Sequence, residues 1–423
     1  MAAKKKAHVW RVGFFLAYRQ VKRASLWTTA LIIAVMTLTF LNLVVVNGVL
    51  VGLIESSVEA TRDRGTGDVV ITTLQQKNQV ERSQDIQNVL RSLPEVKSFS
   101  ARYLGNGVLN ADYRRLLRQD ESANSVGVTI AGIDPLKENA ISRMSEYVVE
   151  GSYLQPNDPD GILIGSNFLF KYTPIEVSGF QTLKDVEIGK KLKLTVGSSS
   201  KEVIVRGFVK SKVDSTDFRV FMIESEVRKM IGRSELNVNE ISIKLASGAT
   251  EQDALRLKQI LLNNGFDVGA RIQTYVEAQP KFLKDMSDTF GLLGNMIGSI
   301  GLAVASITIF IVIFVNAITR RKFIGILKGI GISPKAIEVS YIIQSIFYAV
   351  TGSLLGLLVL YGFLVPYIYA NPIDFPFSDG YLYAPLSGTM IRVVLLITVT
   401  VIAGYIPARM IVKKNTLDAI LGR

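Results

Sequence analysis

Four long apolar stretches constrain the fold of this chain more than any other feature of its 423 residues. A helix needs about 20 predominantly apolar residues to cross the hydrocarbon core of a bilayer. Four segments meet that requirement, and they are residues 27–54, 288–319, 337–369 and 390–412. We therefore predict a membrane protein with four transmembrane α-helices. The first stretch is too long for the apolar region of a signal peptide and has no small-residue cleavage site after it, so we interpret it as a retained anchor.

The cations that flank these stretches predict the orientation of the chain, because short cytoplasmic segments are enriched in Lys and Arg. The short loop 370–389 holds Asp374 and Asp379 and no cation, and Arg392, at the outer edge of the last span, is the exception. The other cations lie before the first span, between the second and third spans, and at or after the end of the fourth: Lys4, Lys5, Lys6, Arg11, Arg19, Lys22 and Arg23; Arg320, Arg321, Lys322, Lys328 and Lys335; Arg409, Lys413, Lys414 and Arg423. We therefore expect both termini and segment 320–336 in the cytoplasm, and residues 55–287 outside.

The net charge of +12 does not indicate nucleic-acid binding, because the cations gather at the predicted cytoplasmic edges. The chain has no cysteine, which excludes disulfides, thiol nucleophiles and thiolate metal sites. Its single histidine, His8, lies in the basic N-terminal tail. A histidine-based metal centre or catalytic triad within one chain is therefore not expected.

The N-terminal tail, residues 1–26, contains an amphipathic pattern. Trp10, Phe14 and Tyr18 recur every fourth residue within residues 9–24, and cations occupy the other positions. This pattern is typical of a helix that lies in the membrane interface. A plain cytoplasmic extension of the first span is the alternative.

Residues 55–287 differ sharply in character, because they are polar and mix two kinds of periodicity. Residues 83–94 have helical spacing with Ser83 as a cap, and residues 250–265 predict a helix that stops at Gly265. Residues 275–290 predict a third helix, which leads into the second span. Strands are expected at residues 68–73, 96–110, 125–134, 161–167, 191–197, 201–212, 217–223 and 239–245. The fold class is thus four transmembrane helices plus one large extracytoplasmic α+β domain, with room for two lobes.

This outer domain shows no catalytic pattern. No spacing singles out a pair among its acids Asp112, Asp120, Glu121, Asp134, Glu138, Glu146 and Glu150, and we interpret them as solvated charges. The acid-rich stretch 155–161 lacks the twelve-residue EF-hand pattern and predicts a turn. The chain contains neither a GxSxG elbow nor a GxxxxGK[ST] phosphate loop. We therefore expect a non-catalytic chain that does not hydrolyse ATP by itself.

The stretch "RRKFIGILKGIGIS", residues 320–333, needs a different explanation. Three adjacent cations fix topology, but the apolar residues that follow would be costly to expose on a short cytoplasmic helix. Gly325 and Gly329, four residues apart, would leave a shallow notch on it. Burial against lipid headgroups and burial in the groove of a partner both account for such a helix.

The longer stretch "NAITRRKFIGILKGIGISPKAI" resembles the segment after the second span in the FtsX-like permease family. These proteins are the membrane subunits of MacB-type (type VII) ABC transporters, which include the lipoprotein-releasing LolC/LolE proteins. Phe323 stands where that family usually has glutamate, and Gly329 where it has alanine. The residues that match its pattern are Arg320, Arg321, Ile324, Gly325, Ile326, Leu327, Lys328, Ile330, Gly331 and Ser333.

Other stretches are similar to the same family in the same order. The N-terminal stretch looks like its amphipathic helix leading into the first span, and residues from 93 to 211 look like its periplasmic core domain. In "YIPARMIVKKNTLDAIL", Pro407, Ala408 and Ala419 match the closing pattern, Asp418 and Ile420 nearly match it, and Thr416 replaces a proline.

The resemblance implies a mechanism and partners. A separate cytoplasmic ABC ATPase dimer would supply ATP and Mg²⁺ binding, and this chain would bind no cofactor or metal. The coupling segment would comprise Arg320, Arg321, Phe323, Ile324, Gly325, Ile326, Leu327, Lys328, Gly329, Gly331 and Ser333. A second permease copy or a paralogue would complete the membrane unit in the inner (cytoplasmic) membrane, in contact with membrane lipid. ATP-driven closure would act on an amphiphilic substrate outside by mechanotransmission, with an extracytoplasmic adaptor or a lipoprotein as a further partner.

Two other functions remain open from the sequence. One is a non-transporting FtsX-like signalling scaffold that controls a cell-wall hydrolase, although such proteins have a much smaller outer domain. The other is a membrane-anchored binding protein with no ATPase. Substrate identity, substrate-contacting residues and the choice between homodimer and heterodimer are not encoded in any motif of this chain.

Overall fold

The computed structural model describes residues 2–114, 123–174, 181–375 and 378–413. Two compact units divide the chain. The membrane unit comprises Met1–Ile54, Asp285–Asp374 and Gly380–Arg423, and the outer unit comprises Glu55–Lys284 and Phe375–Asp379. Each unit is described by itself below.

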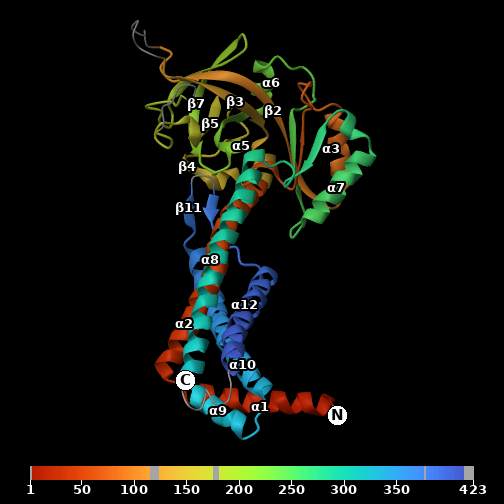
Figure 1. Ribbon diagram of the computed structural model, residues 1–423. Coiled ribbons are helices and arrows are strands. Elements are labelled where there is room, and N and C mark those ends of the chain that lie inside the picture. The colour runs from red at the N-terminus through yellow and green to blue at the C-terminus, as the bar shows by residue number, and fades with distance from the viewer. Residues whose placement is uncertain (1, 115–122, 175–180, 376–377, 414–423) are drawn as a thin grey trace. The chain divides into compact units, whose positions relative to one another are not determined.

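The membrane unit is built from apolar helices (Figure 1). Helices in four segments are long and apolar enough to cross a membrane: Leu26–Thr66, Lys281–Thr319, Pro334–Ala370 and Leu386–Met410. The helical elements of this unit are α1 (Ala2–Lys22), α2 (Leu26–Thr61), α8 (Lys281–Thr319), α9 (Arg321–Gly329), α10 (Pro334–Val359), the π-turn η5 (Leu360–Leu364), α11 (Val365–Ala370) and α12 (Leu386–Val412). The prediction of four apolar helices is confirmed.

Small residues let these helices approach closely. A Cβ atom added at Gly352 of α10 would lie 2.4 Å from Cβ of Met36, and one at Gly356 would lie 2.3 Å from Cδ1 of Phe40. Met36 and Phe40 of α2 are fully buried. Close backbone approach through glycine is how membrane helices gain packing energy, since lipid offers no hydrophobic driving force between them.

Helix α1 packs against the first part of α10 (Figure 1). Gly13 and Ala17 face inward, and a Cβ atom at Gly13 would lie 2.6 Å from Cγ1 of Val339. The aromatic residues Trp10, Phe14 and Tyr18 remain exposed. This arrangement agrees with the prediction of a helix in the membrane interface, because one helix face is packed and the opposite face carries the aromatic residues.

The outer unit contains a four-stranded antiparallel sheet in the order β10-β1-β9-β2. Its elements follow the chain order strand–helix–strand–strand–helix–strand, the split βαβ arrangement of ferredoxin-like domains. They are β1 (Val69–Thr72), α3 (Ser83–Ser92), β2 (Val96–Asn110), β9 (Glu240–Leu245), α7 (Glu251–Asn263) and β10 (Arg271–Thr274). Helices α3 and α7 lie side by side on one face of the sheet (Figure 1).

A closed ring of strands is inserted between β2 and β9. The pairings run β2-β3-β8-β5-β7-β6 and return to β2, because β6 pairs with residues 108–110 of β2. The strands are β3 (Ser125–Ile133), β5 (Gly161–Gly165), β6 (Lys191–Val196), β7 (Ser199–Val209) and β8 (Arg219–Ile223), with β4 (Val148–Gly151) added beside β7. Closure leaves a barrel without free edges around the ring. The α+β prediction is confirmed, and the structure resolves its two lobes as a sheet and a barrel.

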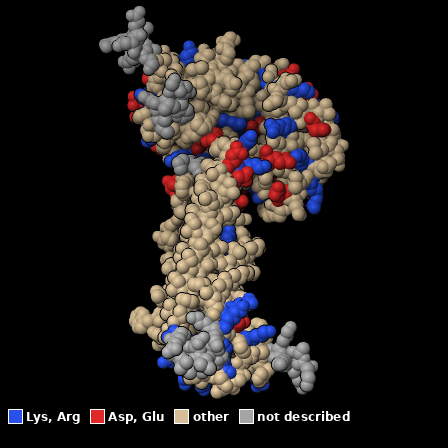
Figure 2. Space-filling view, viewed as in Figure 1, with Lys and Arg blue, Asp and Glu red and all other residues tan. Residues whose placement is uncertain are grey.

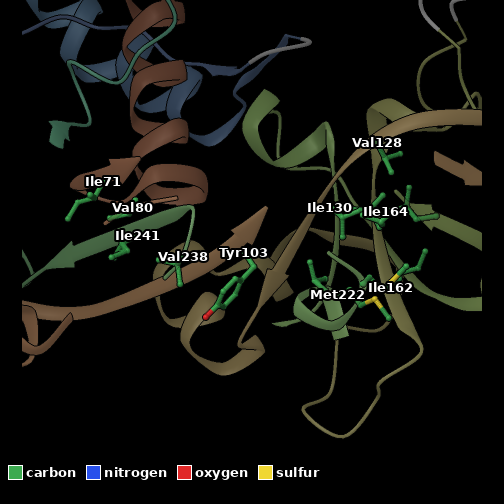
Figure 3. Close-up of a cluster of buried hydrophobic side chains, with 14 of the residues drawn as sticks. Ile71, Val80, Tyr103, Val128, Ile130, Ile162, Ile164, Met222, Val238 and Ile241 are labelled. Carbon is green, nitrogen blue, oxygen red and sulfur yellow. The ribbon is translucent and has the colours of Figure 1, made fainter. Parts of the chain in front are cut away.

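Strand β2 belongs to both lobes. Its residues 96–102 pair with β9 and its residues 103–110 pair with β3. The apolar core follows the same division (Figure 3): Ile71 and Ile241 lie in the sheet, Ile130 and Ile164 lie in the barrel, and Tyr103 lies between them. One strand therefore carries a continuous core through both lobes.

Short helices complete the outer unit. They are the π-turn η1 (Arg62–Thr66), α4 (Pro135–Ser142), η2 (Met144–Tyr147), η3 (Ser166–Phe168), α5 (Asp214–Asp217), α6 (Glu224–Met230) and η4 (Phe266–Val268). The short outer loop predicted at 370–389 forms a two-stranded pair, β11 (Ile373–Phe375) and β12 (Ser378–Gly380). Its residues 375–379 belong to the outer unit.

Three local predictions differ from the structure. Ser83 is the first helical residue and not a cap, because its hydroxyl contacts Asn237 at 3.2 Å. The helix predicted from residue 275 begins at Lys281, directly after Pro280. Glu138 is not solvated but fully buried. By contrast, Thr250 caps α7 through a capping box, and Gly265 adopts the left-handed conformation expected after a helix.

Candidate functional site

The predicted coupling segment folds as α9, a short helix after the second span. Gly331 has φ 92° and follows the helix end, the N–H of Ile332 donates to the Leu327 carbonyl at 3.0 Å, and that of Gly331 donates to Lys328 at 3.0 Å. This is the Schellman arrangement, in which glycine supplies the left-handed conformation. Pro334 then begins α10. Gly331 therefore has a conformational role, and Ser333 immediately precedes the next helix.

One face of α9 packs into the membrane unit. Ile324 is 3% exposed and Gly325 is also buried, while Leu327 is half-buried in the same apolar cluster. The Nζ atom of Lys328 donates to the carbonyl of Val412 at 2.7 Å, near the end of α12. A cation at the last carbonyls of a helix is favourable because those groups carry partial negative charge. These residues hold α9 in place and are not available to a partner.

The opposite face of α9 presents an apolar stripe. Phe323, Ile326 and Ile330 are 62%, 52% and 71% exposed. Their spacing of three and four places them on one side of the helix. Arg321 and Gly329 are exposed as well, and Arg320 and Ser333 are half-buried. The notch proposed at Gly325 and Gly329 does not form as one surface, because Gly325 faces inward.

Sequence reasoning placed all these residues in one segment but did not separate the two faces. The segment is too short for periodicity alone to identify the exposed side, since apolar residues occur on both. The sequence does indicate where the helix ends, because Gly331 and Pro334 are residues typical of a helix end and of the start of the next helix. In the closing stretch, Pro407 and the buried Ala408 lie within α12, and residues 414–423 lie outside the described part of the chain.

The outer unit begins where α2 passes into the π-turn η1. Arg62 pairs with Asp68 at 2.5 Å and lies over the ring of Tyr275, and Asp63 pairs with Lys244 at 2.6 Å. These contacts attach the end of α2 to strands β1 and β9 of the sheet. The first turn of the outer unit is therefore held to the sheet by charged contacts.

A buried ionic network lies next to this turn. Arg102 of β2 binds Glu138 at 2.6 Å, binds Glu240, and donates to the Gly65 carbonyl at 2.8 Å. Arg219 of β8 also binds Glu240, at 2.9 Å. Burial alone would raise the pKa of Glu240, but the two guanidinium groups lower it to about 2. The network joins η1, the sheet, α4 and the barrel at the point where β2 passes between lobes.

The other predicted candidates have ordinary roles. Asp112, Glu146 and Glu150 form ion pairs with Lys190, Arg143 and Lys171, and Asp134 caps α4. Asp120 and Glu121 lie outside the described residues. Residues 155–161 contain a turn in which Asp158 binds Arg206. Among the described residues, no group of His, Asp or Glu side chains is arranged to hold a metal ion.

A hollow in the described outer unit has a volume of about 980 Å³ and a polar lining. Its charged residues are already engaged, since Lys77 pairs with Glu81 and Arg233 donates to Asn239. Figure 2 shows acidic and basic side chains intermixed over the outer unit. In the lining of the hollow, Glu235 also has a partner, because it accepts a hydrogen bond from Gln79 at 2.7 Å.

Comparison with known proteins matches part of the chain to a family of permeases. The model of the FtsX-like permease C-terminal family matches residues 295–416. The ABC transporter permease YtrF of Bacillus subtilis is 28% identical over 202 residues, which cover 45% of this chain and 43% of YtrF. An uncharacterized ABC transporter permease of Methanocaldococcus jannaschii is 25% identical over 301 residues, which cover 68% of this chain and 69% of that protein.

Two solved structures match about half of the chain. The periplasmic region of MacB from Actinobacillus actinomycetemcomitans matches with a TM-score of 0.35 and 14% identity, covering 52% of this chain and 97% of that one. The extracellular domain of the transporter YknZ from Gram-positive bacteria matches with a TM-score of 0.31 and 14% identity, covering 49% and 99%. Because both scores are low, the fold assignment rests on the strand order given above. Residues 295–416 therefore match the FtsX-like permease C-terminal family, and the chain is similar to ABC transporter permeases over 45% and 68% of its length.

Proposed function

We propose that this chain is the permease subunit of an ABC transporter whose separate cytoplasmic ATPase dimer drives export or extraction of an amphiphilic substrate, as in lipoprotein release. The observation that carries the proposal is the exposed apolar stripe of α9. A stripe of large apolar side chains beside cations is costly to leave in water and fits a partner's groove.

The contacts of α9 support a coupling role by mechanotransmission. Its inner face is buried in the membrane unit, and Lys328 ties it to the end of α12. A displacement imposed on Phe323 or Ile326 would therefore move the unit with the helix, because a packed interior transmits strain. Helix α2 then continues past Ile54 into the outer unit without a break in the helix.

The remaining parts of the proposal come from the resemblance to the permease family and from the distribution of cations in the sequence. ATP and Mg²⁺ would be bound by the ATPase, and this chain would be non-catalytic. Both termini would be cytoplasmic in an inner (cytoplasmic) membrane, and a second copy or a paralogue would complete the unit. An extracytoplasmic adaptor or lipoprotein would meet the outer unit. The relatives bear the names of permeases, so no observation favours the signalling-scaffold alternative.

The first test is co-purification from the native membrane, in detergent and then in nanodiscs, followed by an ATPase assay. We expect an ABC ATPase to accompany the wild-type chain. Phe323→Asp combined with Ile326→Asp should reduce the retained ATPase by at least about tenfold, because a charge buried in an apolar groove is strongly unfavourable. Lys335→Asp, an exposed change just beyond α9, serves as the control and should retain the partner.

The outcomes separate the candidate functions. Full retention of the ATPase by the double variant would exclude α9 as the docking helix. A wild-type chain that brings no ATPase would instead favour the anchored-binder function. A co-purifying cell-wall hydrolase, with no substrate-stimulated turnover, would support the scaffold.

A further inference from the structure

The carboxylate of Asp379, in the loop between the third and fourth spans, contacts two cations of the outer unit. Oδ1 of Asp379 accepts a hydrogen bond from Nζ of Lys212 at 2.6 Å, and Oδ2 accepts one from Nη2 of Arg64 at 3.2 Å. The two cationic side chains are largely buried, at 16% and 19% exposed. The carboxylate therefore bridges two cations that water screens only in part.

Both cations are held in place by other contacts. Nη1 of Arg64 donates to the Ser211 carbonyl at 2.8 Å, and its guanidinium lies 4.7 Å from the ring centre of Tyr147. The carbonyl of Arg64 accepts a hydrogen bond from Thr216 at 3.1 Å. Arg64 belongs to η1, where α2 enters the outer unit. One partner of Asp379 is thus part of the first attachment of that unit.

The position of Lys212 is equally fixed. Its φ of 62° lies in the left-handed region, which a residue with a side chain adopts only at a cost in free energy. Asp217 holds it there, accepting hydrogen bonds from the N–H groups of Ser211 and Lys212 at 2.8 Å each. The backbone that carries Lys212 is therefore held by contacts that do not involve Asp379.

This contact lies where the chain passes from the membrane unit to the outer unit and back. Residues 375–379 belong to the outer unit, while Asp374 before them and Gly380 after them belong to the membrane unit. We propose that Asp379 is a positioning residue that makes the loop between the third and fourth spans a third attachment of the outer unit, beside α2 and α8. The attachment itself stands on the contacts above; its part in transport rests on the proposed function.

The electrostatics agree with this role. Burial alone would raise the pKa of Asp379, but Lys212 and Arg64 lower it below its ordinary value. The carboxylate is therefore ionised throughout the neutral range. Asn at this position keeps the shape of the side chain and removes the charge, so both cations lose their charge-assisted bond.

Hydrogen exchange on the full chain in nanodiscs tests the attachment directly. We expect Asp379→Asn to accelerate exchange of the backbone amides in residues 379–384 by about tenfold, the size of a lost charge-assisted bond that is partly exposed. Lys212→Met should have a similar effect, and Asp379→Glu should retain part of the protection. Unchanged exchange in Asp379→Asn would overturn the proposal.

A matched control comes from the same unit. Lys258 and Glu277 form an ion pair of 2.7 Å with side chains 22% and 39% exposed, close to the values for Lys212 and Asp379. Both of its residues lie inside the outer unit, so Glu277→Gln should leave residues 379–384 unchanged. Equal acceleration in this control would show a general loosening and would also count against the attachment. Unchanged exchange in β2 confirms that each variant is folded.

The role in transport needs a second readout. Because the chain has no cysteine, spin labels can be attached at Leu255→Cys and Tyr369→Cys, which are exposed positions in the outer and membrane units. We expect Asp379→Asn to broaden the label-to-label distance distribution and to lower substrate-stimulated ATP hydrolysis while basal hydrolysis is kept. A narrow, unchanged distribution would overturn the third attachment. If no ATPase is recovered, the proposed function fails while the exchange and distance results still decide the attachment.

Discussion

The two units of this protein are held together by different interactions. All ion pairs between described residues lie in the outer unit, while the membrane unit packs apolar side chains around glycine contacts such as Gly352 against Met36. The face of the membrane unit that Figure 2 shows is almost free of charged side chains between its ends. Buried charges are tolerated where polar partners are dense, and helix packing in lipid relies on close contact. The comparison implies that the two units respond to different perturbations.

The largest effect is expected from removing the centre of the ionic network. Arg102→Met leaves Glu138 and Glu240 buried without their shared cation, which should lower the free energy of unfolding of the outer unit by about 3–5 kcal/mol. Hydrogen exchange of β2 and β9 in the full chain measures it. Arg256→Met, at an exposed pair with Asp253 of 3.6 Å, is the control and should change little. A stability loss equal to that of the control would contradict the importance of the network.

Acid should weaken the outer unit before the membrane unit. The pKa of Glu240 is about 2 when folded and near its ordinary 4.5 when unfolded, so its stabilisation is complete above about pH 4.5 and is lost as pH falls toward 2. The expected loss is on the order of 2–3 kcal/mol. Urea titrations of the full chain, followed by tyrosine near-ultraviolet signals at several pH values, measure it. Glu240→Gln should show a flatter pH dependence, and an equal slope would argue against this residue.

A steric change should affect only the membrane unit. Gly352→Ala adds a Cβ atom 2.4 Å from Cβ of Met36, so α10 and α2 must separate, at a cost of about 1–3 kcal/mol. Both tryptophans, Trp10 and Trp27, lie in the membrane unit, so their fluorescence during detergent-induced unfolding reports on it. Gly362→Ala, where no atom lies within 4 Å of the added Cβ, should be close to neutral. Equal effects at both positions would remove the steric explanation.

The smallest effect is expected at the surface of the outer unit. Lys77 and Glu81 form an exposed pair of 2.8 Å, and Lys77→Ala should change stability by no more than about 0.5 kcal/mol. Thermal unfolding of the full chain checks this. A loss comparable with that of Arg102→Met would mean that burial does not distinguish the ion pairs of this unit.

Local features were predictable because their causes are local. Thr250 and Gly265 bound α7 through contacts within a few residues, so both ends can be predicted from the sequence. The prediction that Ser83 caps α3 was wrong, because its hydroxyl contacts Asn237, 154 positions away. Glu138 was interpreted as solvated because its partner Arg102 lies on another element. Each error comes from a long-range partner that periodicity does not report.

The coupling segment shows the same limit. The sequence alone predicts its cations, its apolar residues, its end at Gly331 and its place between two spans. Which apolar residues face outward was decided by packing: Ile324 and Phe323 are adjacent and both apolar, but one is buried and the other exposed. The docking function assigned to Phe323, Ile326 and Ile330 stays a prediction until a partner is measured.

The sequence by itself determined the four apolar helices, the alternation of strands and helices outside, and the short basic segment between the second and third spans. These depend on composition and on periods of two and 3.6 residues. The tertiary structure alone decided the closing of the barrel through β6, the convergence of four elements on Arg102, and the bridging of Lys212 and Arg64 by Asp379. Those features join residues distant in the chain, and their free energy comes from burial and charge pairing that exist only once the chain is folded.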